Sequence, residues 1–553
     1  MLVVVAVGLA ACAPALPATV IAGTKVTAGW TGEFTSANAA AAPTPGNIDI
    51  AETIRADFGD LVDGEFVPDE GFGEITIVSD DPFTVSYDLA EPAWSDDIPL
   101  DAADLLLGWA AGSGYLERGE GAESGGEGLT VPSVDEFARA IEVTFPQPVV
   151  DWQQRVTVPV PAHVVGRLAL GVDDAMEAKQ AVITAIRDDD TEALAAIAEV
   201  WNTGFDIPDD GEIPAELLIS SGPFRVTEVA DAEQGQSVTL VPNAAYRGLV
   251  TPQVAEIDLV PPGEDPIASI GGTLDVLQVA PATVNRERIN ELERKDFAVS
   301  TSNDGTVWAV LLKPAGIFTS ATARAAFIRA VPASALVERG GGVWASAYTP
   351  SSSMVSAPGS RAYDIVSEDS GFAATLGSPG EDAALEREAA GVTAGAQVCV
   401  LYDRASEFAT GAFAALRDAA REAGWAAVDC ASDDLDTAIG AGGWDAVITR
   451  VAVPQSTAQL TAQWGSQGQS SITGHPDPER DALIAQLAQT DDVYAARELR
   501  AQIEASIVRA AVALPLAMNP RVTIVDKDVT GIAPRNGAAG ALTSGVTQWA
   551  VVP

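Results

Sequence analysis

The sequence predicts a mixed α/β protein with more than one sheet and several domains. Strand-like and helix-like segments alternate irregularly along the 553 residues, and no internal repeat is found, a pattern that favours several sheets. Hydrophobic residues make up 47% of the chain, which is enough for sizeable buried cores. Because a domain typically uses roughly 150 residues, we expect three to four domains.

The charge balance is strongly acidic. The chain has 31 Lys and Arg residues against 78 Asp and Glu residues, for a formal net charge of −47. Phosphate backbones are bound through Lys and Arg contacts, so this balance argues against nucleic acid as a partner. Net charge alone does not identify a ligand.

The N-terminus predicts an exported lipoprotein. Leu2 to Ala11 is an unbroken run of apolar or small residues, too short to cross a bilayer and typical of a signal-peptide core. The run ends in Leu9-Ala10-Ala11-Cys12, which resembles a bacterial lipobox and implies removal of residues 1–11 and acylation of Cys12. An ordinary signal peptide or a buried strand with an incidental cysteine is the alternative. No Lys or Arg precedes Cys12, so the true start codon is expected upstream.

No later segment predicts a transmembrane helix. Val508 to Met518 is the most apolar stretch, and it contains Arg509 and Pro515. A lipid anchor is therefore the one membrane attachment we expect, with the globular part on the outer, extracytoplasmic face of the cell membrane.

Cysteine and histidine usage argues against a metal site. The three cysteines, Cys12, Cys399 and Cys430, form no CxxC or Cys/His pattern with zinc-like spacing, and His163 and His475 are far apart. We interpret both histidines as structural and expect no metal and no cofactor. If Cys12 is acylated, Cys399 and Cys430 remain as a pair in an oxidising compartment, which favours a disulfide over two buried thiols.

Two segments in the first half of the chain predict local structure clearly. Phe83 to Leu89 alternates as a half-buried strand, and Trp94 to Asp104 follows as a turn leading into a helix capped by Asp101. Further on, Gly222-Pro223 opens a strand, and a polar turn at Asp231 to Gln236 predicts a hairpin.

The second half predicts a βαβ unit. Gln397 to Tyr402 is typical of a buried strand, Ser406 caps a helix, and Gly424 ends that helix before a strand at Trp425 to Cys430. Residues 443–449 supply a further strand.

In this order, these blocks resemble the signatures of the family 5 solute-binding proteins, which capture peptides, nickel complexes and related solutes for ABC importers. Residues 94–104 are similar to W-S-D-G-x-P-L/V-T/D-A-x-D, with Asp97 in place of Gly, and residues 221–226 and 240–248 are similar to G-T-G-P-Y/F and L-x-x-N-x-x-Y-x-G. The resemblance spans about Gly23 to Trp549. It implies a two-lobed fold like the periplasmic binding proteins of type II, family 5, with an extra subdomain.

The resemblance also implies a division of the chain. The expected parts are a signal peptide (1–11), an anchor and the start of lobe I (12–48), subdomain II (49–214), lobe I continued (215–300), lobe II (301–510) with the βαβ unit at 397–451, and a return to lobe I (511–553).

The ligand site implied by the family comes from three segments. These correspond here to Trp30, Phe34 and Asn38, to Asn303, Asp304 and Trp308, and to Thr449 and Arg450. In many peptide-binding members an Asp near the last segment pairs with the ligand's amino terminus, but no acid occurs between Asp445 and Asp477. Arg450 instead favours a carboxylate. Core packing of the aromatic residues, and a surface role or structural ion pair for Arg450, are the alternatives.

These observations predict a monomeric, lipid-anchored receptor that binds a small molecule or peptide and docks on an ABC permease. The motifs GxSxG, HExxH, SxxK, GxxxxGK[ST] and GxGxxG are missing, which argues against an enzyme. An anchored receptor or adhesion module that is not coupled to transport is the alternative, and a secreted two-acid hydrolase is a more remote one.

Overall fold

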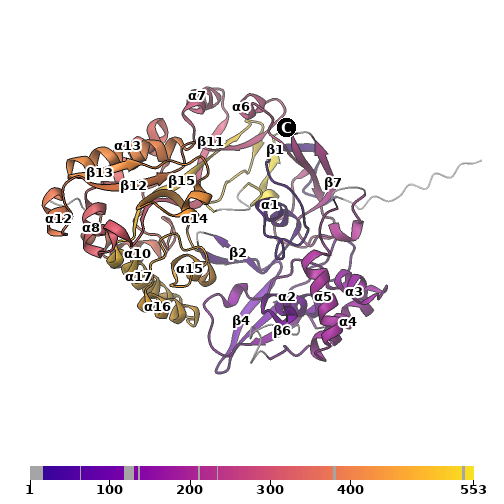
Figure 1. Cartoon of the computed structure of the whole chain (residues 1–553). Helices are drawn as coiled ribbons and strands as arrows, with labels where there is room; N and C mark the ends of the chain where they lie inside the picture. Colours follow the sequence, from indigo (N-terminus) through magenta and orange to yellow (C-terminus); the bar gives the residue numbers. More distant parts are fainter. Residues whose placement is uncertain are drawn as a thin grey trace, which may run out of the picture.

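The computed structural model describes residues 16–62, 64–117, 130–134, 138–208, 212–232, 234–377, 382–537 and 542–552. Figure 1 shows two large lobes and a smaller subdomain beneath the first lobe. The predicted signal peptide and Cys12 lie outside the described residues. Within those residues, helices long and apolar enough to span a bilayer are not found.

One mixed sheet of ten strands runs through both lobes. Its strands are parallel at β1 with β9 and β10 and at β12 with β13 and β14, and antiparallel elsewhere. In spatial order they are β13 (Trp425–Asp429), β12 (Ala396–Tyr402), β14 (Ala446–Ala452), β11 (Ala298–Leu312), β15 (Ala513–Val525), β10 (Val276–Val279), β1 (Ile21–Gly29), β9 (Val254–Val260), β8 (Gly235–Pro242) and β7 (Phe224–Ala232).

Strands β11 and β15 join the two lobes. They pair from Ala298 with Val525 to Asn303 with Pro520, and again from Val307 with Met518 to Leu311 with Ala513. The register is interrupted between Asn303 and Val307. The ladder is locally broken over this irregular stretch, which we call the crossing.

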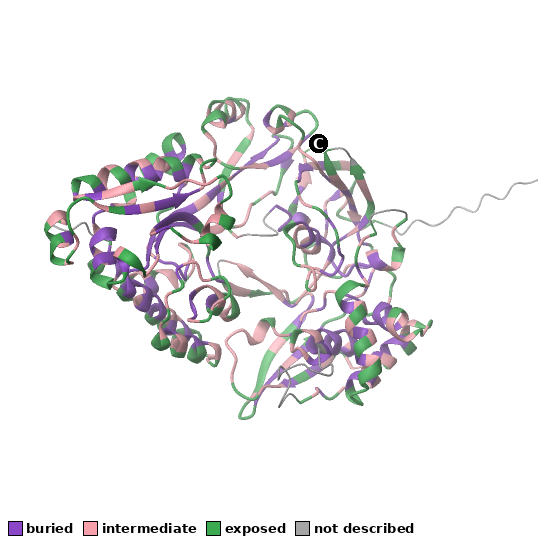
Figure 2. Ribbon diagram, in the orientation of Figure 1, coloured by how far each residue is buried: buried purple, intermediate pink, exposed green. Residues whose placement is uncertain are grey.

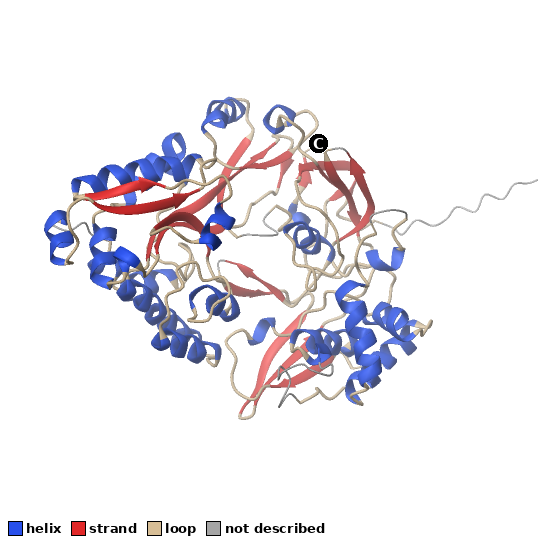
Figure 3. Cartoon of the chain, in the orientation of Figure 1, coloured by secondary structure: helices blue, strands red, loops and turns tan. Residues whose placement is uncertain are grey.

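The second lobe packs helices on both faces of its half of the sheet. Trp308 and Val310 of β11 face one core, whereas Val307 and Ala309 face the other, as the two-residue period of a strand requires. Figures 2 and 3 show buried strands between partly exposed helices. Helices α8 (Ala321–Arg329), α9 (Ala333–Gly341), α12 (Ala383–Ala389) and α13 (Glu407–Glu422) cover the first core, and α10 (Tyr363–Asp369), α14 (Leu435–Ala441), α15 (Thr457–Trp464), α16 (Pro478–Ala488) and α17 (Val493–Ala510) cover the second.

The predicted βαβ unit forms from β12, α13 and β13. Ser406 accepts a hydrogen bond from the backbone N–H of Ala409 at the start of α13. Gly424 has a φ of 80° between helix and strand, a left-handed conformation that glycine adopts without steric cost. Both boundary residues therefore act as the sequence predicted.

The subdomain packs an antiparallel sheet against four helices. The sheet consists of β4 (Gly73–Asp80), β5 (Phe83–Leu89) and β6 (Ala140–Thr144), and the helices are α2 (Ala102–Gly112), α3 (Ala162–Leu170), α4 (Ala175–Arg187) and α5 (Thr191–Thr203). Smaller elements complete the chain: α1 (Pro45–Ile54), the hairpin β2 (Gly59–Val62) and β3 (Glu65–Pro68), α6 (Pro266–Ser269), α7 (Arg286–Glu293), α11 (Phe372–Thr375), and the pair β16 (Val529–Thr530) and β17 (Ala550–Val551).

The segment from Trp94 to Asp104 builds a buried polar network. Asp101 caps α2 as predicted. The Asp104 carboxylate accepts hydrogen bonds from the indole of Trp94 (3.3 Å) and the backbone N–H of Ala162 (2.8 Å). The ammonium group of Lys179 on α4 lies 2.8 Å from Asp104 and 3.1 Å from Asp101. The network therefore joins α2 to both α3 and α4.

Asp97 and His163 complete the same segment. Asp97, which occupies the glycine position of the family signature, has a φ of 66°. Asp tolerates this left-handed region better than most residues, so the turn is kept without glycine. His163 is buried and its Nε2 lies 3.0 Å from the carboxylate of Asp96, which is a structural contact.

Candidate ligand-binding site

A polar cluster lies where β11 and β14 pair in the second lobe. The register places Arg450 opposite Trp308. Arg450 Nη1 lies 3.1 Å from Asp304 Oδ2, and its guanidinium carbon lies 5.9 Å from the centre of the Trp308 ring. Asn519 on β15 donates to Asp304 Oδ2 (2.6 Å) and accepts from the Trp308 indole (2.8 Å). We call Asp304, Trp308, Arg450 and Asn519 the crossing cluster.

An aromatic stack supports this cluster from the core side. The rings of Trp308 and Phe408 are stacked with centroids 4.5 Å apart, and Phe408 stacks on Tyr348 at 4.7 Å. Burial raises the pKa of Tyr348 to about 12, an effect that the nearby carboxylates of Glu407 and Asp304 reinforce and Arg450 opposes. The stack fixes the Trp308 ring, so that one face packs on Phe408 and Arg450 lies over the ring.

Arg450 is the most accessible member of the cluster. Its side chain is 51% exposed, whereas that of Asp304 is 20% exposed. Asp304 keeps its orientation without Arg450, because its other oxygen accepts hydrogen bonds from the backbone N–H and hydroxyl of Thr306. The guanidinium can therefore exchange partners while the carboxylate stays in place.

The first lobe contributes residues near the crossing strands. Trp30, at the end of β1, is buried and donates from its indole to Asp49 Oδ2 (3.0 Å). Arg521 on β15 donates to the backbone oxygen of Asn303 (3.2 Å). Burial lowers the pKa of Arg521, and the charges of Asp304 and Asp49 oppose that shift. The Arg521 guanidinium thus interacts electrostatically with two carboxylates, those of Asp304 and Asp49.

The other predicted site residues lie inside the protein or bond to its backbone. Phe34 is in the core of the first lobe. Asn38 is fully buried and its amide donates to the backbone oxygen of Trp201 (2.8 Å). Thr449 is buried in β14, and the Asn303 side chain accepts from the backbone N–H of Gly305 (3.0 Å). The structure therefore brings Asp304, Trp308 and Arg450 together. Phe34, Asn38 and Thr449 are instead buried, and the Asn303 side chain binds its own loop backbone.

Sequence reasoning missed three contributors to this region: Tyr348, Phe408 and Asn519. Phe408 lies on α13, where it packs in the core and also stacks on Trp308. Asn519 lies in a long strand whose pairing with β11 joins residues about two hundred positions apart. Only knowledge of that pairing could have shown that Asn519 connects Asp304 to Trp308.

A surface hollow lies elsewhere in the second lobe. It has a volume of about 280 Å³ and is formed mainly by α16 and α17, with Asp369, Glu479, Glu498 and Arg509 among its lining residues. Groups of three or more His, Cys, Asp or Glu side chains placed to hold a metal ion are not found in the described part of the chain.

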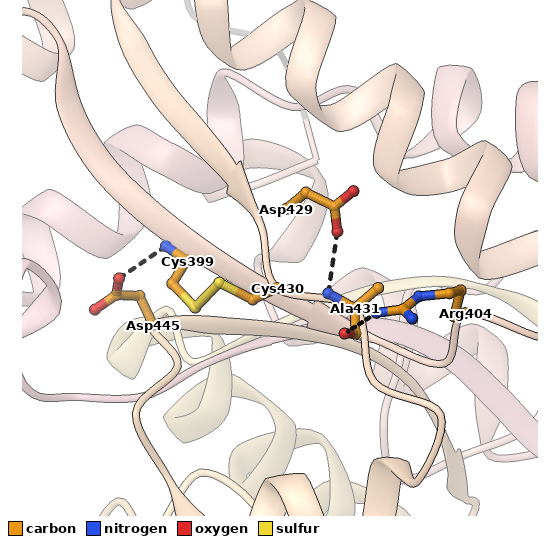
Figure 4. The surroundings of a disulfide bond; sticks show 6 residues. All are labelled: Cys399, Arg404, Asp429, Cys430, Ala431 and Asp445. Carbon is orange, nitrogen blue, oxygen red and sulfur yellow. Dashed lines mark hydrogen bonds between the residues drawn. A yellow bond between two sulfur atoms is a disulfide. The ribbon is translucent and has the colours of Figure 1, made fainter.

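A disulfide joins Cys399 of β12 to Cys430, the residue after β13 (Figure 4). The two Cα atoms are 5.7 Å apart and the cysteines are 31 positions apart in the sequence. Asp445 lies beside the bond, and its carboxylate accepts a hydrogen bond from the backbone N–H of Cys399 (2.9 Å). The bond therefore fixes the edge of the sheet in the second lobe.

The fold is that of the extracytoplasmic solute-binding proteins, and the resemblance to family 5 is confirmed at the level of the fold. The structure is similar to the periplasmic EDTA-binding protein EppA, with a TM-score of 0.75, 17% identity and coverage of 96% of this chain and 97% of that one. The ABC transporter substrate-binding protein CtaP of Listeria monocytogenes gives 0.70 and 16%, with coverage of 96% and 100%. The oligopeptide-binding protein AppA of Bacillus subtilis, in complex with a nonapeptide, gives 0.64 and 13%, with coverage of 96% and 99%.

Sequence relatives add a second kind of similarity. The chain is 27% identical over 286 residues to an uncharacterized lipoprotein of Mycobacterium leprae (strain TN), which covers 49% of this chain and 46% of the relative. An uncharacterized lipoprotein of Mycobacterium tuberculosis (strain H37Rv) is 29% identical over 196 residues, covering 34% of this chain and 33% of the relative. The chain thus matches less than half the length of these relatives. No protein-family model matches the chain.

Proposed function

We propose that this protein is a lipid-anchored solute receptor that captures a peptide-like or other small solute outside the cell and delivers it to an ABC importer. The observation that carries the proposal is the crossing cluster, which contains the accessible ion pair of Arg450 and Asp304 beside the strands that connect the two lobes. The receptor itself catalyses no reaction. Its lobes close on the ligand by a hinge motion, and the closed form docks on the permease.

Within this proposal, lobe I comprises residues 12–48, 215–300 and 511–553, lobe II comprises 301–510, and subdomain II comprises 49–214. Trp30 and the crossing cluster line the ligand site, and Arg450 binds an anionic or carboxylate group of the ligand. Phe34, Asn38, Asn303 and Thr449 hold the backbone around the site. The predicted monomer needs no cofactor.

Native mass spectrometry of gently purified protein tests the binding function. We expect a co-purified small molecule or peptide whose mass is lost on unfolding. Cells that express the protein together with its permease should accumulate that ligand, and deletion of the receptor gene should stop the accumulation. Binding without accumulation would favour a receptor or adhesion module that is not coupled to transport.

The location outside the cytoplasm has two tests. The names of the relatives support a lipoprotein, and Cys12→Ser should release the protein from membranes and remove its acyl mass. The disulfide between Cys399 and Cys430 should leave no titratable thiol in the denatured, unreduced mature protein. Membrane retention of the serine variant would contradict the anchor, and two free thiols would contradict the oxidising compartment.

A further inference from the structure

Two exposed apolar stretches lie side by side on the first lobe. The hydroxyl of Thr19 is 2.9 Å from that of Thr251, and the backbone N–H of Ile21 donates to the backbone oxygen of Gln253 (3.0 Å). These contacts hold residues 16–21 against residues 249–253. The large apolar side chains exposed on these stretches are Leu16, Ile21, Leu249 and Val250, which we call the N-terminal patch.

The patch also differs from the rest of the chain in charge. Of 553 residues, 78 are acidic, yet neither residues 16–32 nor residues 242–255 contain an acid. These longer segments carry one cation each, Lys25 and Arg247. Lys25 is paired with Glu256 and Asp258, so it brings no free charge. The exposed surface of the patch is therefore apolar, with the carboxylates of Glu256 and Asp258 beside Lys25, and that of Asp69 beside Leu249, at its margin.

The length of chain between the patch and the predicted anchor limits what can cover the patch. Leu16 follows Cys12 by four residues, and four peptide units span at most about 15 Å. An acyl chain on Cys12 would hold Leu16, at the start of the patch, within that distance of the bilayer surface. Exposed apolar side chains that are kept there gain free energy by entering the interface between headgroups and acyl chains.

We propose that the N-terminal patch is a membrane-contacting surface, which sets the orientation of the first lobe on the bilayer. The proposal rests on the anchor in the proposed function and goes beyond it, because an anchor alone would leave the globular part free to rotate. The contact is apolar. It requires no anionic lipid, since Arg247 is the one cation without an acidic partner in residues 16–32 and 242–255. The carboxylate of Asp69 also lies near Leu249, beside Gly71.

The test measures the depth of single labels. With Cys12 acylated and Cys399 bonded to Cys430, Leu249→Cys and Val284→Cys each supply one free thiol for an environment-sensitive fluorophore. The two positions are matched in exposure, at 74% and 73%, but Val284 lies beside Thr283, whose hydroxyl bonds to Glu407 of the second lobe. In neutral phosphatidylcholine vesicles that contain quencher-bearing lipid, we expect strong quenching at position 249 and little at 284.

A second version separates the patch from the anchor. A Cys12→Ser chain with an N-terminal hexahistidine tag, held on vesicles by nickel-chelating lipid, keeps a short tether without any acylation. Quenching at position 249 in this form supports the patch even if the native protein carries no acyl group. Adding Val250→Asp should reduce quenching at 249 to the level at 284. Equal quenching at both positions, or quenching at 249 that appears only with anionic phosphatidylglycerol, would overturn the proposal.

Discussion

Two ion pairs in this protein have similar geometry and opposite accessibility. Lys179 and Asp104 lie 2.8 Å apart in the subdomain, with side chains 2% and 0% exposed. Arg450 and Asp304 lie 3.1 Å apart at the crossing of the lobes and are 51% and 20% exposed. The buried pair belongs to the segment with the clearest sequence signature, whereas the accessible pair belongs to no clear motif. The most recognisable motif of the chain thus builds the fold.

The energetics of the two ion pairs explain why the buried pair stabilises the fold and the accessible pair is available to a ligand. A buried charge that loses its partner cannot regain water, so the Lys179 pair persists only while every polar atom around it is satisfied. Burial alone would lower the pKa of Lys179, but the charges of Asp104 and Asp101 outweigh it and raise that pKa. An exposed pair gains at most about 1 kcal/mol, because solvent and salt screen it. Only the second kind of pair can exchange a partner for a ligand.

The largest effect that we expect comes from Lys179→Met, which leaves the buried Asp104 and the partly buried Asp101 without a cation. The free energy of unfolding should fall by about 3–5 kcal/mol, measured by denaturant unfolding followed by circular dichroism. Lys25→Met is the matched control, since Lys25 also pairs with two carboxylates but its side chain is 47% exposed. The control should cost about 1 kcal/mol or less. Equal losses for both variants would remove the distinction between the two kinds of pair.

Glu504 extends the comparison to a buried acid for which no cationic partner is found in the described residues. Burial raises its pKa from 4.5 to about 7, although Ser353, Met354 and Val355 donate hydrogen bonds to it and lower the pKa. The folded state therefore holds the proton more tightly than the unfolded state. The stabilisation is complete below about pH 4.5 and is lost as the pH rises to about 7, a change of about 3 kcal/mol.

Glu504→Gln removes this titration and keeps the shape of the side chain. Relative to the variant, the wild type should lose about 3 kcal/mol of stability between about pH 4.5 and pH 7, measured as the difference between the two unfolding free energies at each pH. Taking the difference cancels the contributions of other groups that titrate in this range. Asp57 is one of them, because burial raises its pKa to about 7 as well. Parallel pH profiles for the two proteins would show that Glu504 does not titrate in this range.

Local elements could be predicted from the sequence because their signals are local. The Asp101 cap, the strand from Phe83 to Leu89 and the glycine stop at Gly424 each depend on residues within one or two turns of chain. The crossing cluster depends on the register of β11 with both β14 and β15. That register is set by long-range pairing, so Arg450 could be singled out from the sequence but its contacts with Trp308 and Asn519 could not.

Arg450→Ala should affect binding without affecting folding. Loss of a charge-assisted contact should weaken the binding of a carboxylate-bearing ligand by roughly 1.5–3 kcal/mol, which is about tenfold or more, measured by calorimetry with the ligand identified by mass spectrometry. The free energy of unfolding should change by less than about 1 kcal/mol. Arg404→Ala is the control, because Arg404 forms an exposed ion pair with Asp433 in the same lobe and should change neither quantity. An unchanged affinity for Arg450→Ala would place Arg450 outside the site.

A third ion-paired group links separate parts of the chain directly. Glu65, at the start of β3, lies 2.9 Å from Arg497 of α17 through one carboxylate oxygen and 2.9 Å from Arg361 through the other. Figure 1 shows the β2–β3 hairpin between the two lobes. Among the three side chains only Arg361 is largely exposed. The group is thus less buried than the first pair, and it lies between the lobes as the second pair does.

Glu65→Gln should have the smallest effect and should act on the arrangement of the lobes. Removing the charge weakens the contact by about 0.5–1 kcal/mol, a change of a few fold in the closed population. Small-angle scattering of the ligand-free protein at low salt should then give a larger radius of gyration for the variant. High salt should move the wild type toward the same value, because screening weakens the same pairs. Glu70→Gln is the control and should behave as wild type, because Glu70 is a neighbouring exposed acid for which no ion pair is found in the described residues. Identical scattering for wild type and Glu65→Gln at low salt would show that the hairpin does not hold the lobes together.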